Sequence, residues 1–212
     1  MKNCYVVEHP LIQHKCTRLR DKATEPAEFR QLVEDVSLLM AYEVTRNFRT
    51  VPIEVETPMA KTSSLILDEP VALVSILRAG NAMLTGMTKL LPEAPIGFVG
   101  IYRDKFIQDT VEYYFRLPEG IEGKKVLLLD CILSTGETAR AAVSRLKDYG
   151  VKDICFVSLL CSQQGLEAFH QAHPDTLVYT TQVEPEVDEQ GYLVPGIGDV
   201  GDRLYGSFDK RL

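Results

Sequence analysis

The sequence predicts an α/β protein in which a mostly parallel sheet lies between helices. Several short runs are almost entirely apolar, which indicates strands that are buried on both faces. Amphipathic helical patterns fall between these runs, and this βαβ order is typical of parallel sheets. The chain has 212 residues, the length of one domain. We expect a core at about 25–182 and a small hood built from the terminal segments, 1–24 and 183–212.

The first quarter of the chain combines an irregular segment with one strong helical pattern. Residues 1–21 have no clean period and are expected to lie against the body as an arm. A long amphipathic helix is predicted at about 25–48, with Pro26 in its first turn. The alternation at 51–56 then predicts a half-buried edge strand.

The remaining elements alternate between strand and helix. Buried strands are predicted at 71–77, 95–101, 125–130 and 154–160, with a further strand at 111–117. Helices are predicted between them at 81–91, 137–149 and 163–172. The polar segment 103–110 is expected to be a mobile loop. After a strand near Leu177, the chain ends in a glycine-rich tail at 191–206.

Charge and hydropathy exclude several classes of partner. The net charge is −7, with 23 basic and 30 acidic residues, and this balance disfavours binding to long nucleic acids or anionic membranes. The longest nearly apolar run, 154–161, is shorter than the roughly 18 residues of a membrane helix. No signal peptide is recognised at the amino terminus, so we expect a cytoplasmic protein without nucleic-acid or membrane partners.

The cysteines and histidines do not form a recognisable metal or disulfide pattern. The five cysteines are Cys4, Cys16, Cys131, Cys155 and Cys161, and no two of them form a Cys-x-x-Cys pair. We interpret them as reduced core residues. His170 and His173 could share a helix face, but no acid or cysteine completes a ligand set, and solvated histidines are the simpler interpretation.

The strongest local signal is the segment 126–139, in which a buried strand ends in Asp130 and a hydroxyl-rich loop leads into a helix. Ligands of open parallel sheets bind at the carboxyl ends of strands. The free N–H groups of the helix start form an anion site. Thr135 and Thr138 add hydroxyl donors, and Gly136 lets a phosphate approach the backbone. An ordinary strand, turn and Thr-capped helix would have the same pattern.

This segment resembles the phosphoribosyl diphosphate motif of type I phosphoribosyltransferases, and the rest of the chain is similar to their uracil phosphoribosyltransferase branch. The further matching blocks, in the order of that family, are 9–15, 20–22, 56–62, 76–80, 102–104 and 192–206. The resemblance implies the type I phosphoribosyltransferase fold. It also implies transfer of the phosphoribosyl group from 5-phospho-α-D-ribose 1-diphosphate to uracil, which gives UMP and diphosphate. Mg²⁺ is the implied cofactor, held mainly by substrate with no direct protein ligand.

The resemblance also implies the site residues. The implied catalytic residues act electrostatically, without a covalent nucleophile: Asp130, Arg78 and Arg103. The implied binding residues for the phosphoribosyl donor are Arg78, Arg103, Asp130, Cys131, Ile132, Leu133, Ser134, Thr135, Gly136, Glu137, Thr138 and Asp199. The implied uracil-binding residues are Leu193, Gly198, Asp199 and Val200. A homodimer or homotetramer and a GTP effector are further implications.

Two of these assignments have a physical reason of their own. Arg78 follows an apolar strand, so its guanidinium can hold diphosphate oxygens at the sheet edge; a surface salt bridge is the alternative. Arg103 could close over the diphosphate as a lid, or be an exposed loop charge. Lys61 and Lys105 are weaker candidates for the same anion field.

The glycine-rich tail suits recognition of a flat base. Main-chain N–H and C=O groups have fixed roles, so they can accept uracil and reject cytosine, whose N3 and N4 groups have the opposite roles. A tail that packs around the body is the alternative.

Three residues of the phosphate loop depart from the family. Cys131 stands where Pro is usual, Ser134 where Ala is usual, and Glu137 where a small residue is common. We expect Glu137 to point outward, because a carboxylate would repel a phosphate. Cys131 suggests activity that is sensitive to oxidation.

Two other functions remain open from the sequence. One is a non-enzymatic regulator on the same fold that senses pyrimidine nucleotides or binds RNA, which would need a local basic patch. The other is a phosphoribosyltransferase for another base.

Overall fold

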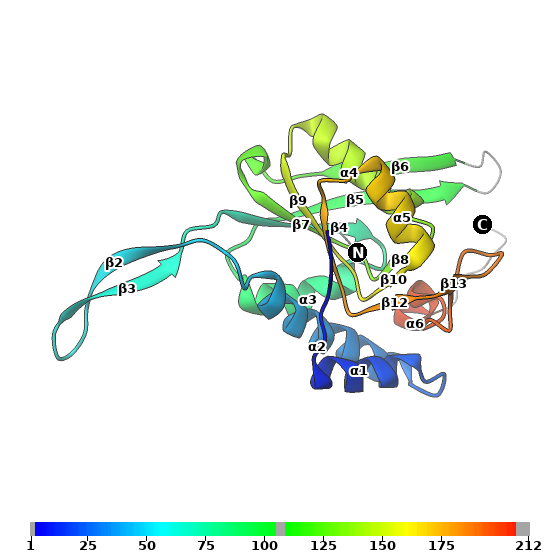
Figure 1. Ribbon diagram of the computed structural model, residues 1–212, viewed down its shortest axis with the longest axis horizontal. Coiled ribbons are helices and arrows are strands. Elements are labelled where there is room, and N and C mark those ends of the chain that lie inside the picture. Colours follow the sequence, from blue (N-terminus) through cyan, green and yellow to red (C-terminus); the bar gives the residue numbers. More distant parts are fainter. Residues whose placement is uncertain (1–2, 105–108, 207–212) are drawn as a thin grey trace.

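A seven-stranded sheet forms the centre of the computed structural model, which describes residues 3–104 and 109–206 (Figure 1). Its strands, in spatial order, are β1 (Cys4–Val6), β11 (Leu177–Thr180), β9 (Asp153–Val157), β7 (Lys125–Leu129), β4 (Val71–Leu77), β5 (Ile96–Asp104) and β6 (Asp109–Arg116). All neighbours are parallel except β5 and β6, which are antiparallel. The predicted mostly parallel sheet is confirmed.

Helices cover both faces of this sheet. On one face lie α2 (Pro26–Val44) and α3 (Asn81–Leu90), and α4 (Glu137–Tyr149) and α5 (Gln163–Ala172) lie on the other (Figure 1). Alternate residues of β7 enter two separate cores: Leu127 and Leu129 pack with α2 and α3, whereas Val126 and Leu128 pack with α4 and α5. Burial on both faces explains why these strands are continuously apolar. The predicted helices are confirmed.

The amino-terminal segment is more regular than we expected. Residues 4–6 form β1, which pairs in parallel with β11 at the sheet edge, and α1 (Pro10–Arg20) packs against α2. The segment lies against the body as expected, but it contains a helix that the sequence pattern did not predict, because α1 buries only Ile12, Cys16 and Leu19. So narrow an apolar stripe, among many polar residues, gives a weak helical signal.

The predicted edge strand at 51–56 is instead half of a separate hairpin. Among the described strands, β2 (Thr50–Glu56) pairs only with β3 (Lys61–Leu67), in antiparallel register from Thr50–Leu67 to Glu56–Lys61. The hairpin projects from the body at the end opposite β13 (Figure 1). Lys61 pairs there with Glu54, 3.2 Å away, so it does not belong to the anion field of its own chain.

Short elements extend the carboxyl end of the sheet. A small parallel sheet contains β8 (Ile132–Leu133), β10 (Leu160–Ser162) and β12 (Gln182–Glu184), so the strand predicted at 154–160 is divided in two. β13 (Glu186–Val187) pairs with β14 (Leu193–Val194), and α6 (Val200–Tyr205) follows. A 3₁₀ turn at Ile121–Gly123 precedes β7.

The sequence predicts a mobile loop at 103–110, between the two strands at the edge of the sheet. β5 ends at residue 104 and β6 begins at residue 109, so the strands extend into the segment that was predicted to be a loop. Lys105 lies outside the described residues.

Within residues 3–104 and 109–206, no helix is long and apolar enough to cross a membrane.

Candidate active site

The predicted phosphate loop surrounds a pocket of about 240 Å³ at the carboxyl end of the sheet. The pocket is lined by Asp130, Ile132, Leu133, Ser134, Thr135, Gly136, Glu137, Thr138, Ala139, Gln190 and Gly191. α4 begins at Glu137, so the free N–H groups of its first turn belong to this wall. The structure therefore brings together the predicted loop residues, apart from Cys131. Gln190 and Gly191 add an opposite wall that was not predicted.

Contacts from α5 and the tail hold the loop in place. Ser162 Oγ donates to Ser134 O at 2.6 Å and accepts from Gly165 N at 2.7 Å. Ser134 Oγ donates to Gly191 O at 2.6 Å, which gives this unusual serine a local role. A Cβ on Gly165 would lie 1.9 Å from Ser134 O, so only glycine permits this approach.

The glycine-rich tail lines a second pocket of about 230 Å³. Its walls are Ala79, Asp130, Ile132, Gly191, Tyr192, Leu193, Ile197, Gly198, Asp199, Val200 and Gly201. All four residues predicted to bind uracil are among them. Asp130, Ile132 and Gly191 line both pockets, so the two cavities adjoin at Asp130.

Asp130 is the charged group at this junction. Burial raises the pKa of its carboxyl to about 7, although hydrogen bonds from the backbone N–H groups of Cys131 and Ile132 oppose the shift. A carboxylate in this buried environment can bind a cation or accept hydrogen bonds from hydroxyl groups. Such perturbed acids are concentrated at functional sites.

Arg78 directly follows β4 and lies beside the second pocket. Its Nη2 atom is 3.6 Å from the place where a Cβ on Gly201, a wall residue, would stand. Tyr205 donates its hydroxyl to Arg78 O at 3.1 Å. A Cβ on Gly80 would lie 2.2 Å from Leu129 O, so the turn that carries Arg78 packs on the end of β7. The structure thus brings Arg78 near Asp199, whose Oδ1 is 3.2 Å from the same Cβ position on Gly201.

Asp199 caps α6 and is bound to an aromatic wall residue. Its Oδ1 accepts from Asp202 N at 3.0 Å, and its Oδ2 accepts from Tyr192 at 3.1 Å. This hydrogen bond raises the pKa of the Tyr192 hydroxyl. Tyr192 was missed as a site residue, although it lies in the matching tail block.

For three of the predicted site residues, Arg103, Cys131 and Glu137, the structure supports less than the full prediction. The side chain of Arg103, at the end of β5, is not among those that the structure describes. Cys131 is buried, and its thiol donates a hydrogen bond to Ala79 O at 3.2 Å. Only the backbone of Cys131 therefore remains for the predicted contact with the phosphoribosyl donor. Glu137 contributes to the wall of the phosphate-loop pocket, and the outward direction of its carboxylate stays a prediction.

We expect Cys131 to resist oxidation and alkylation, contrary to the expectation from sequence. Burial, followed by the nearby Asp130 charge, raises the pKa of its thiol well above the usual value. Burial also raises the pKa of Cys155 and Cys161 to about 12. Thiol counting with a disulfide reagent should therefore find Cys4 reactive in the native protein and the buried thiols reactive only in denaturant. Rapid native modification of Cys131 would contradict this.

The described residues form no cluster that could enclose a metal ion. Within residues 3–104 and 109–206, no group of three His, Cys, Asp or Glu side chains is placed to bind one. His173 Nε2 instead lies 3.1 Å from Arg140 O, and His170 Nε2 lies 3.2 Å from Thr176 O. Asp130 is the acid at the junction of the pockets, which suits a Mg²⁺ ion that keeps most of its ligands from substrate oxygens and water.

Comparison with known proteins agrees with this geometry. The family model described as uracil phosphoribosyltransferase matches residues 6–207. A uracil phosphoribosyltransferase of Dictyoglomus turgidum is 48% identical over 203 residues, 95% of this chain and 98% of the relative. The solved structure of the AQ2163 protein from Aquifex aeolicus is 32% identical, with a TM-score of 0.89 over 96% of this chain and 98% of that one.

A more distant structure shares the fold. Adenine phosphoribosyltransferase from Trypanosoma brucei, solved with AMP, pyrophosphate and ribose-5-phosphate, is 12% identical, with a TM-score of 0.59 over 90% of this chain and 88% of that chain. A mostly parallel sheet between helices, with a hydroxyl-rich loop after an acid at its carboxyl end, is the fold of the type I phosphoribosyltransferases. Within that class, the family match over nearly the whole chain is decisive: the chain belongs to the uracil phosphoribosyltransferase family.

Proposed function

We propose that the protein transfers the phosphoribosyl group of 5-phospho-α-D-ribose 1-diphosphate to uracil, giving UMP and diphosphate. The observation that carries this proposal is the pair of adjoining pockets. One is walled by the phosphate loop and the other by the glycine-rich tail, and they share Asp130, Ile132 and Gly191. A sugar at the junction would place its 5′-phosphate in the first pocket and its C1 atom towards a base in the second.

The residues of the site supply charge and position rather than a covalent nucleophile. Thr135, Thr138 and the first N–H groups of α4 would bind the 5′-phosphate. Asp130 would orient the ribose hydroxyls and stabilise the positive charge that develops on the sugar as the C1–O bond breaks. Arg78 and Arg103 would stabilise the departing diphosphate. The remaining donor contacts are proposed for the other residues of the loop 130–138 and for Asp199.

Mg²⁺ belongs to the proposal as a cofactor that enters with the donor. Asp130 would hold it through water, and the ion would neutralise part of the diphosphate charge. Coordination mainly by substrate is consistent with a site that offers one acid at the junction of its pockets.

Base recognition is proposed for Leu193, Gly198, Asp199 and Val200. The glycines of this segment allow unusual backbone angles, with φ +75° at Gly198, so main-chain groups can be directed at the edge of uracil. Cytosine would leave buried polar groups unpaired in such a pocket.

An assay of the purified protein tests the function. The donor and Mg²⁺ are supplied with uracil, cytosine, hypoxanthine or orotate in separate reactions, each with and without GTP, which we propose as an effector. UMP formation with uracil alone is the expected result. Another base as the best substrate would favour the second candidate, and no nucleotide formation under any condition would leave the regulatory candidate.

Replacing Arg78 with Ala should lower kcat/KM about 100-fold, because one charge-assisted contact to the leaving group is lost. Steady-state rates against donor concentration measure this effect. Arg46→Ala is a suitable control, since Arg46 is exposed and pairs with Glu43 on α2. Equal kcat/KM values for the Arg78 variant and the native enzyme would remove Arg78 from the site.

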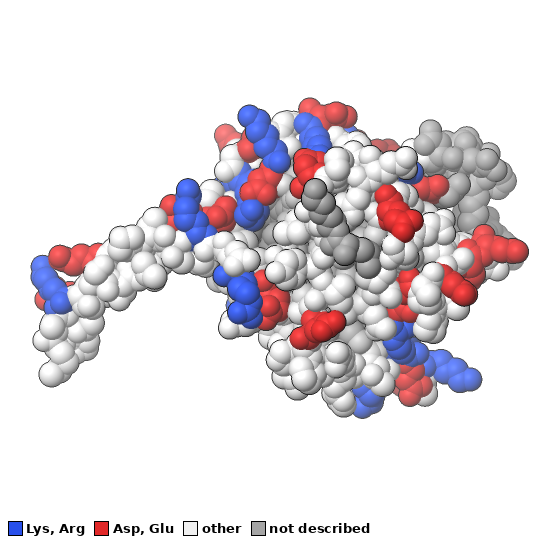
Figure 2. Space-filling view, in the orientation of Figure 1, with Lys and Arg blue, Asp and Glu red and all other residues white. Residues whose placement is uncertain are grey.

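We also propose that the protein is a homodimer or homotetramer, with the β2–β3 hairpin in the contact. An isolated two-stranded hairpin is marginal in water, yet Val51, Ile53, Val55 and Ile66 share one of its faces by register. Ile53 and Ile66 are exposed, and most of the projecting hairpin lacks charge in the view of Figure 2. A second copy of the chain could cover this face.

Introducing charge on this face should dissociate the oligomer. Ile66→Glu is expected to shift the molar mass in solution towards the monomer, as light scattering after size exclusion would measure. Ser63→Glu places the same charge on the opposite face of β3 and is the control. A native enzyme that is already monomeric at assay concentrations would contradict the proposal.

Domain organisation and location complete the proposal. We treat residues 1–212 as one phosphoribosyltransferase domain. A cytoplasmic location is supported by five cysteines that are all free. The acidic composition, and the scattered Lys and Arg side chains among acidic ones on the face in Figure 2, support a small-molecule enzyme without a nucleic-acid partner.

A further inference from the structure

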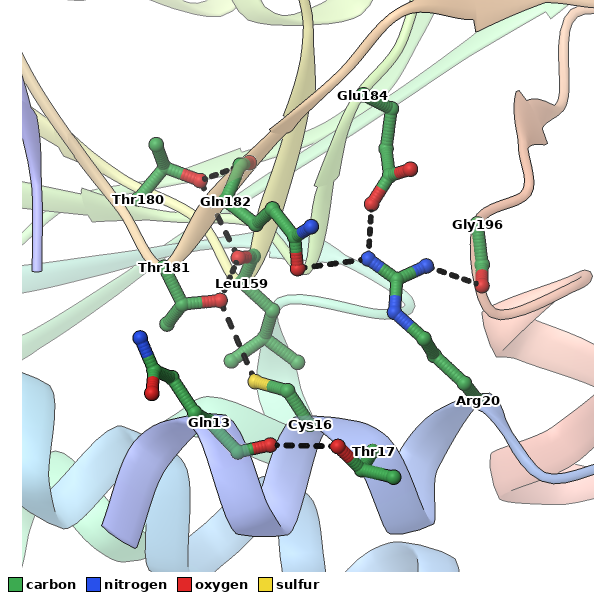
Figure 3. A network of polar contacts seen from close by, with 10 residues as sticks. All are labelled: Gln13, Cys16, Thr17, Arg20, Leu159, Thr180, Thr181, Gln182, Glu184 and Gly196. Atoms are coloured by element: carbon green, nitrogen blue, oxygen red, sulfur yellow. Dashed lines mark hydrogen bonds and ion pairs between the residues drawn. The ribbon is translucent and has the colours of Figure 1, made fainter. Parts of the chain in front are cut away.

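A polar network outside both pockets joins the end of α1 to the loop that lines the second pocket (Figure 3). Arg20, the last residue of α1, donates from Nη1 to Gly196 O at 2.9 Å. Its Nη2 donates to Gln182 Oε1 at 2.8 Å and to the Glu184 carboxylate. The Glu184 side chain is 1% exposed. A buried carboxylate thus fixes the guanidinium that binds the loop.

The loop carbonyl that Arg20 binds belongs to a tight turn. Gly196 has φ +55°, and a Cβ on it would lie 2.2 Å from Leu193 O. Leu193, three residues before this glycine, and Ile197, directly after it, both line the second pocket. Holding Gly196 in place therefore fixes the spacing between two parts of the pocket wall.

The next carbonyl along the loop is held by a second arginine. Arg203 of α6 donates from Nη1 to Ile197 O at 3.0 Å and to Leu19 O, and from Nη2 to Asp21 O at 2.7 Å. Its guanidinium also stacks over Phe29 of α2, 4.2 Å from the ring centre. Arg203 thus connects the end of α1 to the same loop from another direction.

Each held carbonyl fixes the direction of an N–H group. A peptide unit is planar, so Gly196 O and Ile197 N–H lie in one plane, and Ile197 O and Gly198 N–H lie in the next. Two consecutive peptide planes are therefore oriented by guanidinium groups outside the pocket. Without them, a loop that contains Gly196 and Gly198 would have many accessible conformations.

We propose that Arg20 and Arg203 are positioning residues for uracil recognition: they orient the main chain at 196–198 before the base binds. This inference rests on the proposed function, because it assigns these residues to the base pocket of a uracil phosphoribosyltransferase. Neither guanidinium needs to touch the substrate. Preorganisation of this kind improves affinity by reducing the ordering that binding requires.

Arg20 is the better residue to test, because Arg203 makes more contacts with the body. Removing Arg20 alone would leave the buried Glu184 charge without this guanidinium, which could prevent folding. The test variant is therefore Arg20→Met combined with Glu184→Met, which removes both charges. Arg18→Met with Glu28→Met is the control, since it removes another arginine–glutamate pair, an exposed one between α1 and α2 that does not contact the loop.

We expect the double variant to change the KM for uracil and to leave the other kinetic constants nearly unchanged. The KM for uracil should rise about tenfold, the change that corresponds to about 1.4 kcal/mol, while kcat and the KM for the donor change less than twofold. The control should match the native enzyme. Hydrogen exchange at the Ile197 and Gly198 amides should be faster in the test variant, with the core strands unchanged.

Two results would overturn the inference. One is native uracil KM and native amide exchange in the test variant; the other is a parallel rise in both KM values, which would indicate general loosening. A native protein that forms no UMP would instead contradict the proposed function. Hydrogen exchange would in that case still report whether Arg20 orders the loop.

Discussion

Replacing Asp130 with Asn is expected to remove nearly all UMP formation while making the ligand-free protein more stable at neutral pH. Asp130 lies where the two pockets adjoin, so its charge is close to the place proposed for the reacting sugar. Loss of one oriented charge that acts in the transition state typically lowers kcat by about 10²–10³. Asn keeps the size of the side chain and can still accept hydrogen bonds from Cys131 and Ile132.

The gain in stability follows from the raised pKa of Asp130. Its folded value of about 7 lies above the ordinary 3.8, so the folded protein binds a proton more tightly than the unfolded chain. The free energy of unfolding therefore decreases as pH rises from about 4 to 7, and the full penalty is present above pH 7. Each pKa unit corresponds to about 1.4 kcal/mol. Both pockets admit solvent to the carboxylate, which weakens the effect of burial. We therefore expect the free energy of unfolding at pH 8 to be about 2 kcal/mol higher for the Asn variant than for the native protein.

Thermal or urea unfolding of both proteins between pH 4 and 9 checks this expectation. The variant should be more stable at pH 8, and its advantage should disappear towards pH 4. In the native enzyme, kcat/KM for the donor should fall as pH drops below about 7, because protonation removes the same charge. Asp153→Asn, at an exposed pair with Lys125, is the control. If the variant lost activity but its free energy of unfolding at pH 8 did not increase, burial of the Asp130 charge would not destabilise the native protein.

The parts of the fold that the sequence predicts well are those whose burial follows from local composition. β4 and β7 are continuously apolar because helices cover both faces of the sheet. The phosphate loop is equally local, since an acid, hydroxyls and a glycine are contiguous at 130–138. Strand, loop and helix start are therefore recognisable in one stretch of chain.

The parts that the sequence did not predict depend on contacts between distant segments. The hairpin alternates like a half-buried strand, yet its apolar face has no partner within the described part of the chain. Gln190 and Gly191 line the same pocket as the phosphate loop, and Ser134 binds Gly191 across 57 positions of the sequence. Tyr192 enters the site through its bond to Asp199. No local pattern encodes such pairs.

Gly165 shows how such a distant contact could control activity, and Gly165→Ala should strongly impair donor binding. Gly165 stands in the first turn of α5, where alanine would ordinarily favour the helix by about 1 kcal/mol. Here its Cβ would lie 1.9 Å from Ser134 O and 2.8 Å from Ser134 C. Since both are backbone atoms of the phosphate loop, the loop must move.

The movement should affect the donor more than the base. A displacement of about 1 Å at a binding loop can lower kcat/KM about 100-fold, and overpacking should reduce the free energy of unfolding by about 1–3 kcal/mol. Donor titrations and urea unfolding measure the two effects. Gly123→Ala is the matched control, because a Cβ there meets nothing within 4 Å. If Gly165→Ala kept the native KM for the donor, the contact between α5 and the loop would not determine the geometry of the phosphate site. A rise in the donor KM, set against a rise in the uracil KM for the Arg20 variant, would assign the two pockets to the two substrates separately.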